Sequence, residues 1–132
     1  MPIIDTVVLF AAADERDRYH RPARRHLGSI RKNDTYLASF ALLEFDITLK
    51  SRGFSFEERM ERHALLLRDY PLLDRRVAAL SPSTFYLAAR LEDEADLEYF
   101  DAGVAAEALQ LDGTVISTDT AFEQVRSLRR IW

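Results

Sequence analysis

The sequence has 132 residues, of which 48% are apolar and 30% are charged, a composition typical of one folded globular domain. Cysteine is absent, which excludes disulfides, thiolate nucleophiles and cysteine-ligated zinc. The net charge of −4 lacks the positive excess that a general nucleic-acid wrapper carries. Because we find no apolar run of membrane-spanning length and no signal peptide, we expect a cytoplasmic protein without membrane contact.

The first half of the sequence predicts strands that alternate with helices. Apolar runs indicate strands, and apolar residues at helical spacing indicate helices. A capping box at Ser55 and Glu58 begins one helix, which Pro71 ends. The other elements expected here are strands over 2–5 and 35–39 and helices over 7–10, 20–31 and 41–52.

The second half continues this alternation. We expect helical structure over 72–80, 84–90, 99–111 and 120–126, strands over 114–117 and 130–132, a turn at 81–83 and an acidic solvated loop over 92–98. Strands separated by helices predict an α/β fold, a three-layer α/β/α sandwich with a central, mostly parallel sheet of four or five strands. Ligands in such folds bind outside the carboxyl ends of the strands.

Two acids follow predicted strands directly. Asp5 ends the first strand, and Asp119 comes just after the strand over 114–117, so we expect both at the carboxyl edge of the sheet. A single Asp at such a position is usually a helix N-cap, because its carboxylate accepts hydrogen bonds from backbone N–H groups. Two of them in one small sheet favour a shared site.

Glu44 and Asp101 are two further candidate site residues. Glu44 lies about 160° around its helix from Asp46, which we expect to pair with Lys50, and no Lys or Arg stands one turn from Glu44. Asp101 opens the helix over 99–111. Structural alternatives remain open for both: Glu44 as a boundary residue with its carboxylate in water, and Asp101 as an acid that the helix dipole favours.

Four carboxylates at one edge of a sheet predict a metal site. Packed carboxylates raise one another's pKa unless a cation keeps them ionised. Their oxygen atoms, without Cys and without histidines at zinc-site spacing, suit Mg²⁺ or Mn²⁺.

Four short segments carry a resemblance to a known family. They are Ile3-Ile-Asp-Thr6, Ser39-Phe-Ala-Leu-Leu-Glu44, Tyr99-Phe-Asp-Ala102 and Ile116-Ser-Thr-Asp-Thr-Ala-Phe122. In their order and spacing, over about 3–131, the chain resembles the PIN-domain family, including VapC-like toxin ribonucleases. The resemblance implies that the catalytic, metal-binding acids are Asp5, Glu44, Asp101 and Asp119. It also implies supporting roles for Thr6, Ser39, Ser117 and Thr118.

The activity that this resemblance implies is Mg²⁺- or Mn²⁺-dependent cleavage of phosphodiester bonds in single-stranded or structured RNA, by one nuclease domain over 1–132. It also implies a homodimer and a small protein antitoxin, as in type II toxin–antitoxin pairs. Arg16, Arg18 and Arg21 are candidate RNA contacts. The acids interleaved with them, Asp14, Glu15 and Asp17, favour a solvated surface over RNA contact.

Two other functions fit parts of the pattern. Val7 stands where the family often has Asn or Ser, which leaves open a weakly active or inactive PIN-fold module that binds RNA or protein. A phospho-receiver domain also gathers acids on a parallel sheet. It needs a Lys beside the phosphorylated Asp, and the lysines of this chain are Lys32 and Lys50.

Overall fold

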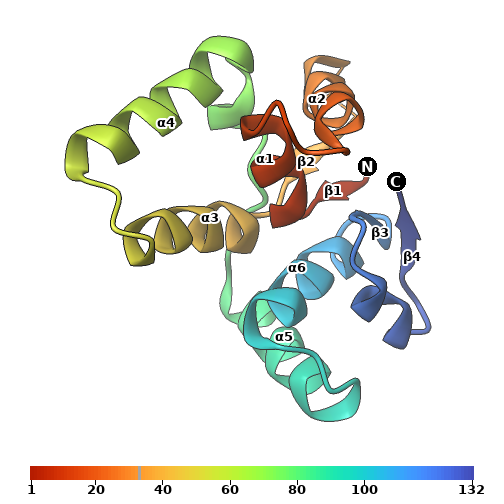
Figure 1. The fold of residues 1–132 in the computed structure, drawn as a ribbon. Helices are drawn as coiled ribbons and strands as arrows, with labels where there is room; N and C mark the ends of the chain where they lie inside the picture. The colour runs from red at the N-terminus through yellow and green to blue at the C-terminus, as the bar shows by residue number, and fades with distance from the viewer. Residues whose placement is uncertain (33) are drawn as a thin grey trace.

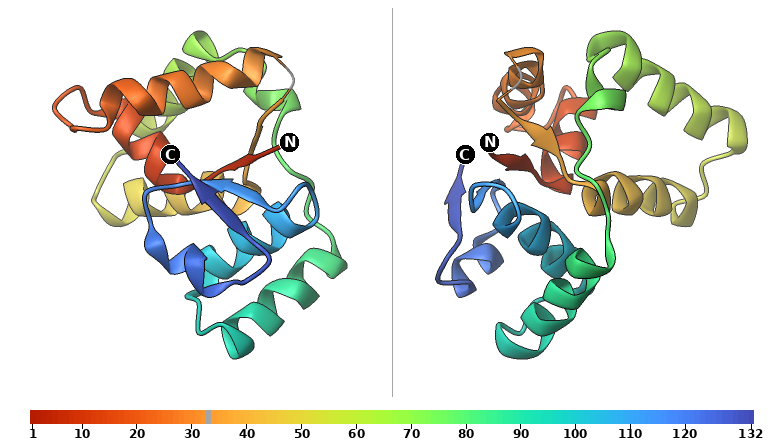
Figure 2. Two further views of the ribbon diagram at one scale, coloured as in Figure 1. Left: turned by 90° about the vertical axis from the view of Figure 1, so that its right-hand side faces the viewer. Right: turned by 180° about the vertical axis from the view of Figure 1, so that it is seen from behind.

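The computed structural model describes residues 1–32 and 34–132 and places six α-helices and four strands in them. In chain order the elements are β1 (Ile3–Ile4), α1 (Thr6–Ala13), α2 (His20–Gly28), η1 (Ser29–Lys32), β2 (Tyr36–Leu37), α3 (Ser39–Ser51), α4 (Phe56–Asp69), η2 (Leu73–Arg75), α5 (Pro82–Glu94), α6 (Tyr99–Leu109), β3 (Thr114–Ile116), η3 (Thr120–Gln124) and β4 (Arg129–Ile131), where η marks a 3₁₀ helix. Figure 1 shows how these elements are arranged, and the left view of Figure 2 shows the two chain ends apart from each other.

The four strands form one parallel sheet in the order β2-β1-β3-β4. β1 pairs with β3 so that Ile4 lies beside Ile116, and both residues of β1 are fully buried. Helices α1 and α2 lie on one side of the sheet and α5 and α6 on the other, as Figure 2 shows. The α/β sandwich with a parallel sheet is therefore confirmed, with four strands that are all parallel.

The helix predicted over 72–80 is wrong, and so is the turn predicted at 81–83, which is described below. Most of 72–80 is not helical, because Val77 pairs with Leu37 at the open edge of β2, where unpaired backbone groups need partners. The Leu37 N–H donates to the Arg76 carbonyl at 2.7 Å, and the Ala78 N–H donates to the Leu37 carbonyl at 2.9 Å. A tertiary partner thus outweighs local helix propensity.

Helix α5 is longer than the sequence indicates. The Ser81 hydroxyl accepts a hydrogen bond from the Thr84 N–H, and Pro82 is the first helical residue, so the expected turn at 81–83 is the helix start. The helix continues to Glu94, so the first half of the acidic stretch is helical and not a loop. Among the described residues, no helix has the combination of length and apolarity that crossing a membrane requires.

Helix α4 extends away from the sheet (Figure 1). The predicted capping box between Ser55 and Glu58 is present at its start. Its Arg59 donates to Asp46 of α3 at 2.8 Å, and the ring of His63 also contacts Asp46 at 2.8 Å, so Asp46 pairs with α4 and the expected pair with Lys50 is wrong.

Helices α3 and α6 make the closest approach that bears on the candidate site. A Cβ atom built on Gly103 of α6 would lie 2.3 Å from ring carbons of Phe40 of α3. Phe40 is itself buried, with 2% of its surface exposed, so its ring has little room to move. Glycine at this position therefore lets the two helices pack together.

We expect Gly103→Ala to destabilise the protein by about 1–3 kcal/mol, although Ala has the higher helix propensity, because the added methyl overpacks the Phe40 contact. Gly28→Ala is the matched control, since Gly28 ends α2 and a methyl group there would meet no neighbouring atom of the described residues within 4 Å. Chemical denaturation of both variants measures the effect. Equal stabilities for Gly103→Ala and wild type would contradict the packing account.

Candidate functional site

Asp5 and Asp119 lie at neighbouring strand ends and are linked through Ser117. The Ser117 hydroxyl donates to Asp5 Oδ2 at 2.7 Å and accepts a hydrogen bond from the Asp119 N–H at 3.0 Å. Asp119 Oδ1 accepts a hydrogen bond from the Ala121 N–H and caps η3. Asp5 precedes α1, but its carboxylate does not cap that helix. The N-cap alternative therefore describes Asp119 in part and does not describe Asp5.

The pKa of Asp5 shows that its buried position disfavours the ionised form of the carboxyl. Only 2% of Asp5 is exposed, and burial raises the pKa of its carboxyl from 3.8 to about 6. The hydrogen bond from Ser117 opposes this rise, whereas the carboxylates of Glu44 and Asp119 add to it. The negative charges of Glu44 and Asp119 therefore lie close enough to raise the pKa of Asp5.

Glu44 joins this group from α3. It is half-buried, and its Oε2 accepts a hydrogen bond from the Thr6 hydroxyl at 2.9 Å. Thr6 is the first residue of α1, so the residue after Asp5 orients the carboxylate of Glu44. One carboxylate oxygen of Glu44 therefore has a partner in the protein, while the residue lies at the boundary between core and solvent.

Asp101 completes the group from the first turn of α6. Burial raises its pKa to about 7, and the carboxylates of Asp119, Asp5 and Glu44 add to the rise, as does Glu98 at the start of the helix. In the described part of the chain no ion pair involves any of the four acids. The protein therefore gathers negative charge here, and none of its described basic residues forms an ion pair that balances it.

The donor set fits a hard divalent cation. Within residues 1–32 and 34–132, no group of three or more His, Asp or Glu side chains is arranged so that it could hold a metal ion. Mg²⁺ needs fewer protein ligands, because it commonly keeps several waters and uses one or two carboxylates. Asp5 and Asp119 provide two carboxylates, and the Ser117 hydroxyl joins the Asp5 carboxylate to the backbone N–H of Asp119. Glu44 lies close enough to raise the pKa of Asp5, and the other three acids raise the pKa of Asp101.

The remaining predicted residues are distributed more widely. Ser39 bonds to Glu107 and not to the candidate acids. Thr118 is half-buried between Ser117 and Asp119, and the described contacts give its side chain no hydrogen bond to the acids. The end of α1 lies roughly 12 Å along the helix from Asp5. The three candidate RNA contacts come after that end in the sequence; they are Arg16, Arg18 and Arg21.

Glu107 is a buried acid that our sequence analysis missed. It lies in α6 and has 1% of its surface exposed. A usable signal was present, because no Lys or Arg stands three or four residues from it in an otherwise apolar helix.

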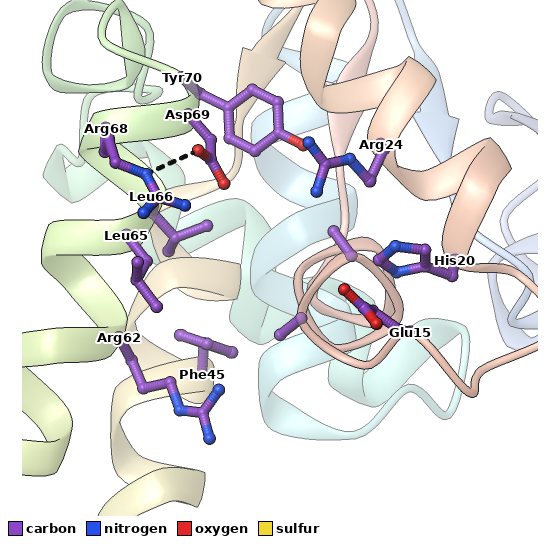
Figure 3. A pocket seen from close by; sticks show the side chains of 12 residues that line it. Glu15, His20, Arg24, Phe45, Arg62, Leu65, Leu66, Arg68, Asp69 and Tyr70 are labelled. Atoms are coloured by element: carbon purple, nitrogen blue, oxygen red, sulfur yellow. Dashed lines mark hydrogen bonds and ion pairs between the residues drawn. The ribbon is translucent and has the colours of Figure 1, made fainter.

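A cavity of about 150 Å³ lies between α1, α2, α3 and α4, away from the acids (Figure 3). Phe45, Leu65 and Leu66 give it apolar walls, and Arg24 and Arg62 line it as well. None of the four candidate acids contributes to its lining. The cavity is therefore distinct from the candidate site.

The raised pKa values predict an unusual dependence of stability on pH. With folded pKa values of about 6 and 7, against 3.8 for an ordinary Asp, the folded state binds more protons than the unfolded state between about pH 4 and pH 7. This contribution to the free energy of unfolding therefore falls as the pH rises through that window. In chelator-containing buffer, Asp101→Asn should be more stable than wild type at pH 8 and equal to it near pH 4.

Asp46→Asn is the comparison variant, because the pKa of Asp46 is lowered whereas that of Asp101 is raised. Hydrogen bonds from Arg59 and His63 lower the pKa of Asp46 to about 2, so its stabilising contribution is present at pH 7 and is lost as the pH falls from about 4 to 2. Thermal unfolding across this pH range measures both variants. A stability difference for Asp101→Asn that did not change with pH would show that burial and the neighbouring acids do not raise the pKa of Asp101.

Comparison with known proteins agrees with this architecture. The chain is similar to FitAcB from Neisseria gonorrhoeae, with 20% identity, coverage of 98% of this chain and 96% of that chain, and a TM-score of 0.75. VapBC2 from Rickettsia felis, bound to a DNA fragment from their promoter, gives 15% identity, 98% and 96% coverage and a TM-score of 0.73. FitAB bound to an IR36 DNA fragment gives 19% identity, 99% and 94% coverage and a TM-score of 0.73.

At these identities the structural likeness supports the fold alone, and no curated protein matches the chain at a significant level. The family model of the PIN domain matches residues 3–128, which is nearly the whole length. The chain therefore belongs to the PIN domain family.

Proposed function

We propose that residues 1–132 form a single nuclease domain that hydrolyses phosphodiester bonds of RNA with the help of Mg²⁺ or Mn²⁺. The observation that supports this proposal is the mutual effect of the four acids on the pKa values of Asp5 and Asp101, with no ion pair to any of the four among the described residues. Membership of the PIN family supports a nuclease in general terms. The metal, the RNA substrate and the role of each acid are parts of the proposal.

In this proposal Asp5 and Asp119 hold the main ion, and Glu44 and Asp101 complete or orient its shell. When bound, a divalent cation lowers the pKa of an attacking water and stabilises charge on the leaving oxygen. The chain's own hydroxyls keep two of the ligands in place, because Ser117 donates to Asp5 and Thr6 donates to Glu44. Without a cation, burial and the neighbouring acids raise the pKa of Asp101 to about 7, and a bound divalent cation would favour its ionised form.

Single-stranded RNA is the substrate that we favour, because its flexible backbone and exposed bases can enter a site at a sheet edge. Arg16, Arg18 and Arg21 would contact phosphates several nucleotides from the bond that is cut. Among the described residues Arg16 pairs with exposed Asp14 alone, at 3.3 Å, and a phosphate competes readily with such a surface pair.

The direct test is cleavage of a labelled single-stranded RNA with Mn²⁺ or Mg²⁺, with and without chelator. We expect cleavage that chelator abolishes. Asp5→Asn and Asp119→Asn should each reduce the rate by about 100-fold or more, because metal catalysis contributes several kcal/mol and each 1.4 kcal/mol is tenfold.

Glu94→Gln is the matched control for this test, since Glu94 is an exposed acid that pairs with Arg90 on α5 and lies outside the candidate site. It should cleave like wild type. Undiminished cleavage by both Asp variants would refute the site assignment. RNA binding without any cleavage by the wild-type protein would favour the alternative of an inactive binding module, to which Val7 points.

We further propose that a protein partner covers the outer face of α3 and α4, either a second copy of the chain or a small antitoxin. Large apolar side chains are unusually exposed on this face, with Phe56 77% and Met60 71% accessible. Leu67 on α4 and Leu43 and Ile47 on α3 are also exposed. The apolar surface of this face borders the Asp46–Arg59–His63 contact between the two helices.

Light scattering and co-purification with the product of a neighbouring gene test this proposal. Met60→Glu should turn a dimer into a monomer if the partner is a second copy, or abolish co-purification if the partner is an antitoxin. Leu80→Glu, at an exposed apolar residue outside the face, should do neither. Unchanged assembly of Met60→Glu in both assays would rule out this face as the interface.

A further inference from the structure

Glu107 is a fully buried carboxylate for which the proposed chemistry has no use. Its Oε2 accepts hydrogen bonds from the Ser39 N–H at 2.9 Å and the Ser39 hydroxyl at 2.8 Å, and its Oε1 accepts one from the Phe40 N–H at 3.0 Å. Three donors therefore converge on this side chain from the first turn of α3. Charged acceptors at a helix start receive such bonds most favourably.

Helix α3 cannot cap itself. Its N-cap residue is Ala38, whose side chain has no acceptor, so the first N–H groups of the helix need a partner from elsewhere. Glu107 provides that partner from α6, 68 residues later in the chain. The α3–α6 junction therefore consists of this cap and the Phe40 ring packed on Gly103.

Both helices lead from this junction to a candidate metal ligand. Glu44 follows Ser39 by five residues on α3, roughly 7.5 Å along the axis, and Asp101 precedes Glu107 by six residues on α6, roughly 9 Å along the axis. Hydrogen-bonded helices are stiff over such short lengths. The position of α3 against α6 at the junction consequently sets where Glu44 lies relative to Asp101.

We propose that Glu107 is a positioning residue: by capping α3 from α6 it sets the distance between Glu44 and Asp101 and with it the affinity of the site for a divalent cation. This inference rests on the proposed metal-dependent function. Glu107 contacts neither substrate nor ion in this role and acts through the placement of Glu44.

Direct titration with Mn²⁺ in the absence of RNA tests the inference. Glu107→Gln preserves the volume of the side chain but replaces one acceptor oxygen with an NH₂ group that faces an N–H or O–H donor. We expect Mn²⁺ affinity to fall by about 10-fold or more, the effect typical of residues that orient metal ligands. Ser39→Ala removes one of the three donors and should give a smaller loss in the same direction.

A double-mutant cycle separates positioning from simple loss of stability. If Glu107 acts through Glu44, then in a Glu44→Gln background the change Glu107→Gln should cause no further loss of Mn²⁺ affinity. Amide hydrogen exchange at Ser39 and Phe40 should also accelerate in Glu107→Gln. An additive loss in the cycle would overturn the positioning role.

Thr84→Val is the matched control. Thr84 is fully buried, and its hydroxyl donates to Gln110 at the end of α6 at 2.7 Å, so its loss weakens the α5–α6 contact without touching α3. It should lower stability and leave Mn²⁺ affinity unchanged. Equal affinity of Glu107→Gln and wild type would overturn only the role of Glu107, whereas no Mn²⁺ binding by wild type would overturn this role and the proposed function together.

Discussion

Burial of carboxylates near one another at the sheet edge is the constraint around which this structure is organised. Asp5 is buried at the end of β1, and its pKa of about 6 reflects first its removal from water and then the like charges of Glu44 and Asp119. The protein does not relieve this cost with an arginine or a lysine among its described residues. It relieves part of it with hydroxyl donors, from Ser117 to Asp5 and from Thr6 to Glu44.

The architecture explains how the acids meet. Parallel pairing of β1 with β3 places the carboxyl ends of two strands side by side, which brings Asp5 next to the segment that carries Asp119. The other two acids arrive on α3 and α6, whose separation depends on the glycine contact and the carboxylate cap between them. A buried, destabilised group of charges that the rest of the fold holds in place is typical of a functional site.

Much of this could be predicted from local patterns. Strand-end positions indicated a common edge for Asp5 and Asp119 because strands separated by helices run parallel, and the α/β/α sandwich followed from the same alternation. The capping box at Ser55 and Glu58 is encoded within four residues, so its prediction was confirmed. These features depend on neighbours in the sequence or on a general rule of topology.

The features that the sequence did not reveal depend on distant partners. Val77 is extended because the edge of β2 is open, and Asp46 turns to Arg59 because α4 folds back beside α3. Glu107 stood out by its lack of a nearby base, as Glu44 did, but nothing local indicated that its partner is the start of α3. The sequence analysis assigned Ser39 to the site, whereas its hydrogen bonds go to Glu107.

The central claim is that the four acids form the preferred divalent-cation site of the molecule. Paramagnetic broadening of backbone amide signals by substoichiometric Mn²⁺ tests it most directly, because broadening falls steeply with distance from the ion. Our account predicts that the amides of Asp5, Glu44, Asp101 and Asp119 lose intensity first, while those of the exposed acidic turn over 92–94 of α5 persist. First broadening at 92–94, or uniform broadening across the protein, would contradict it.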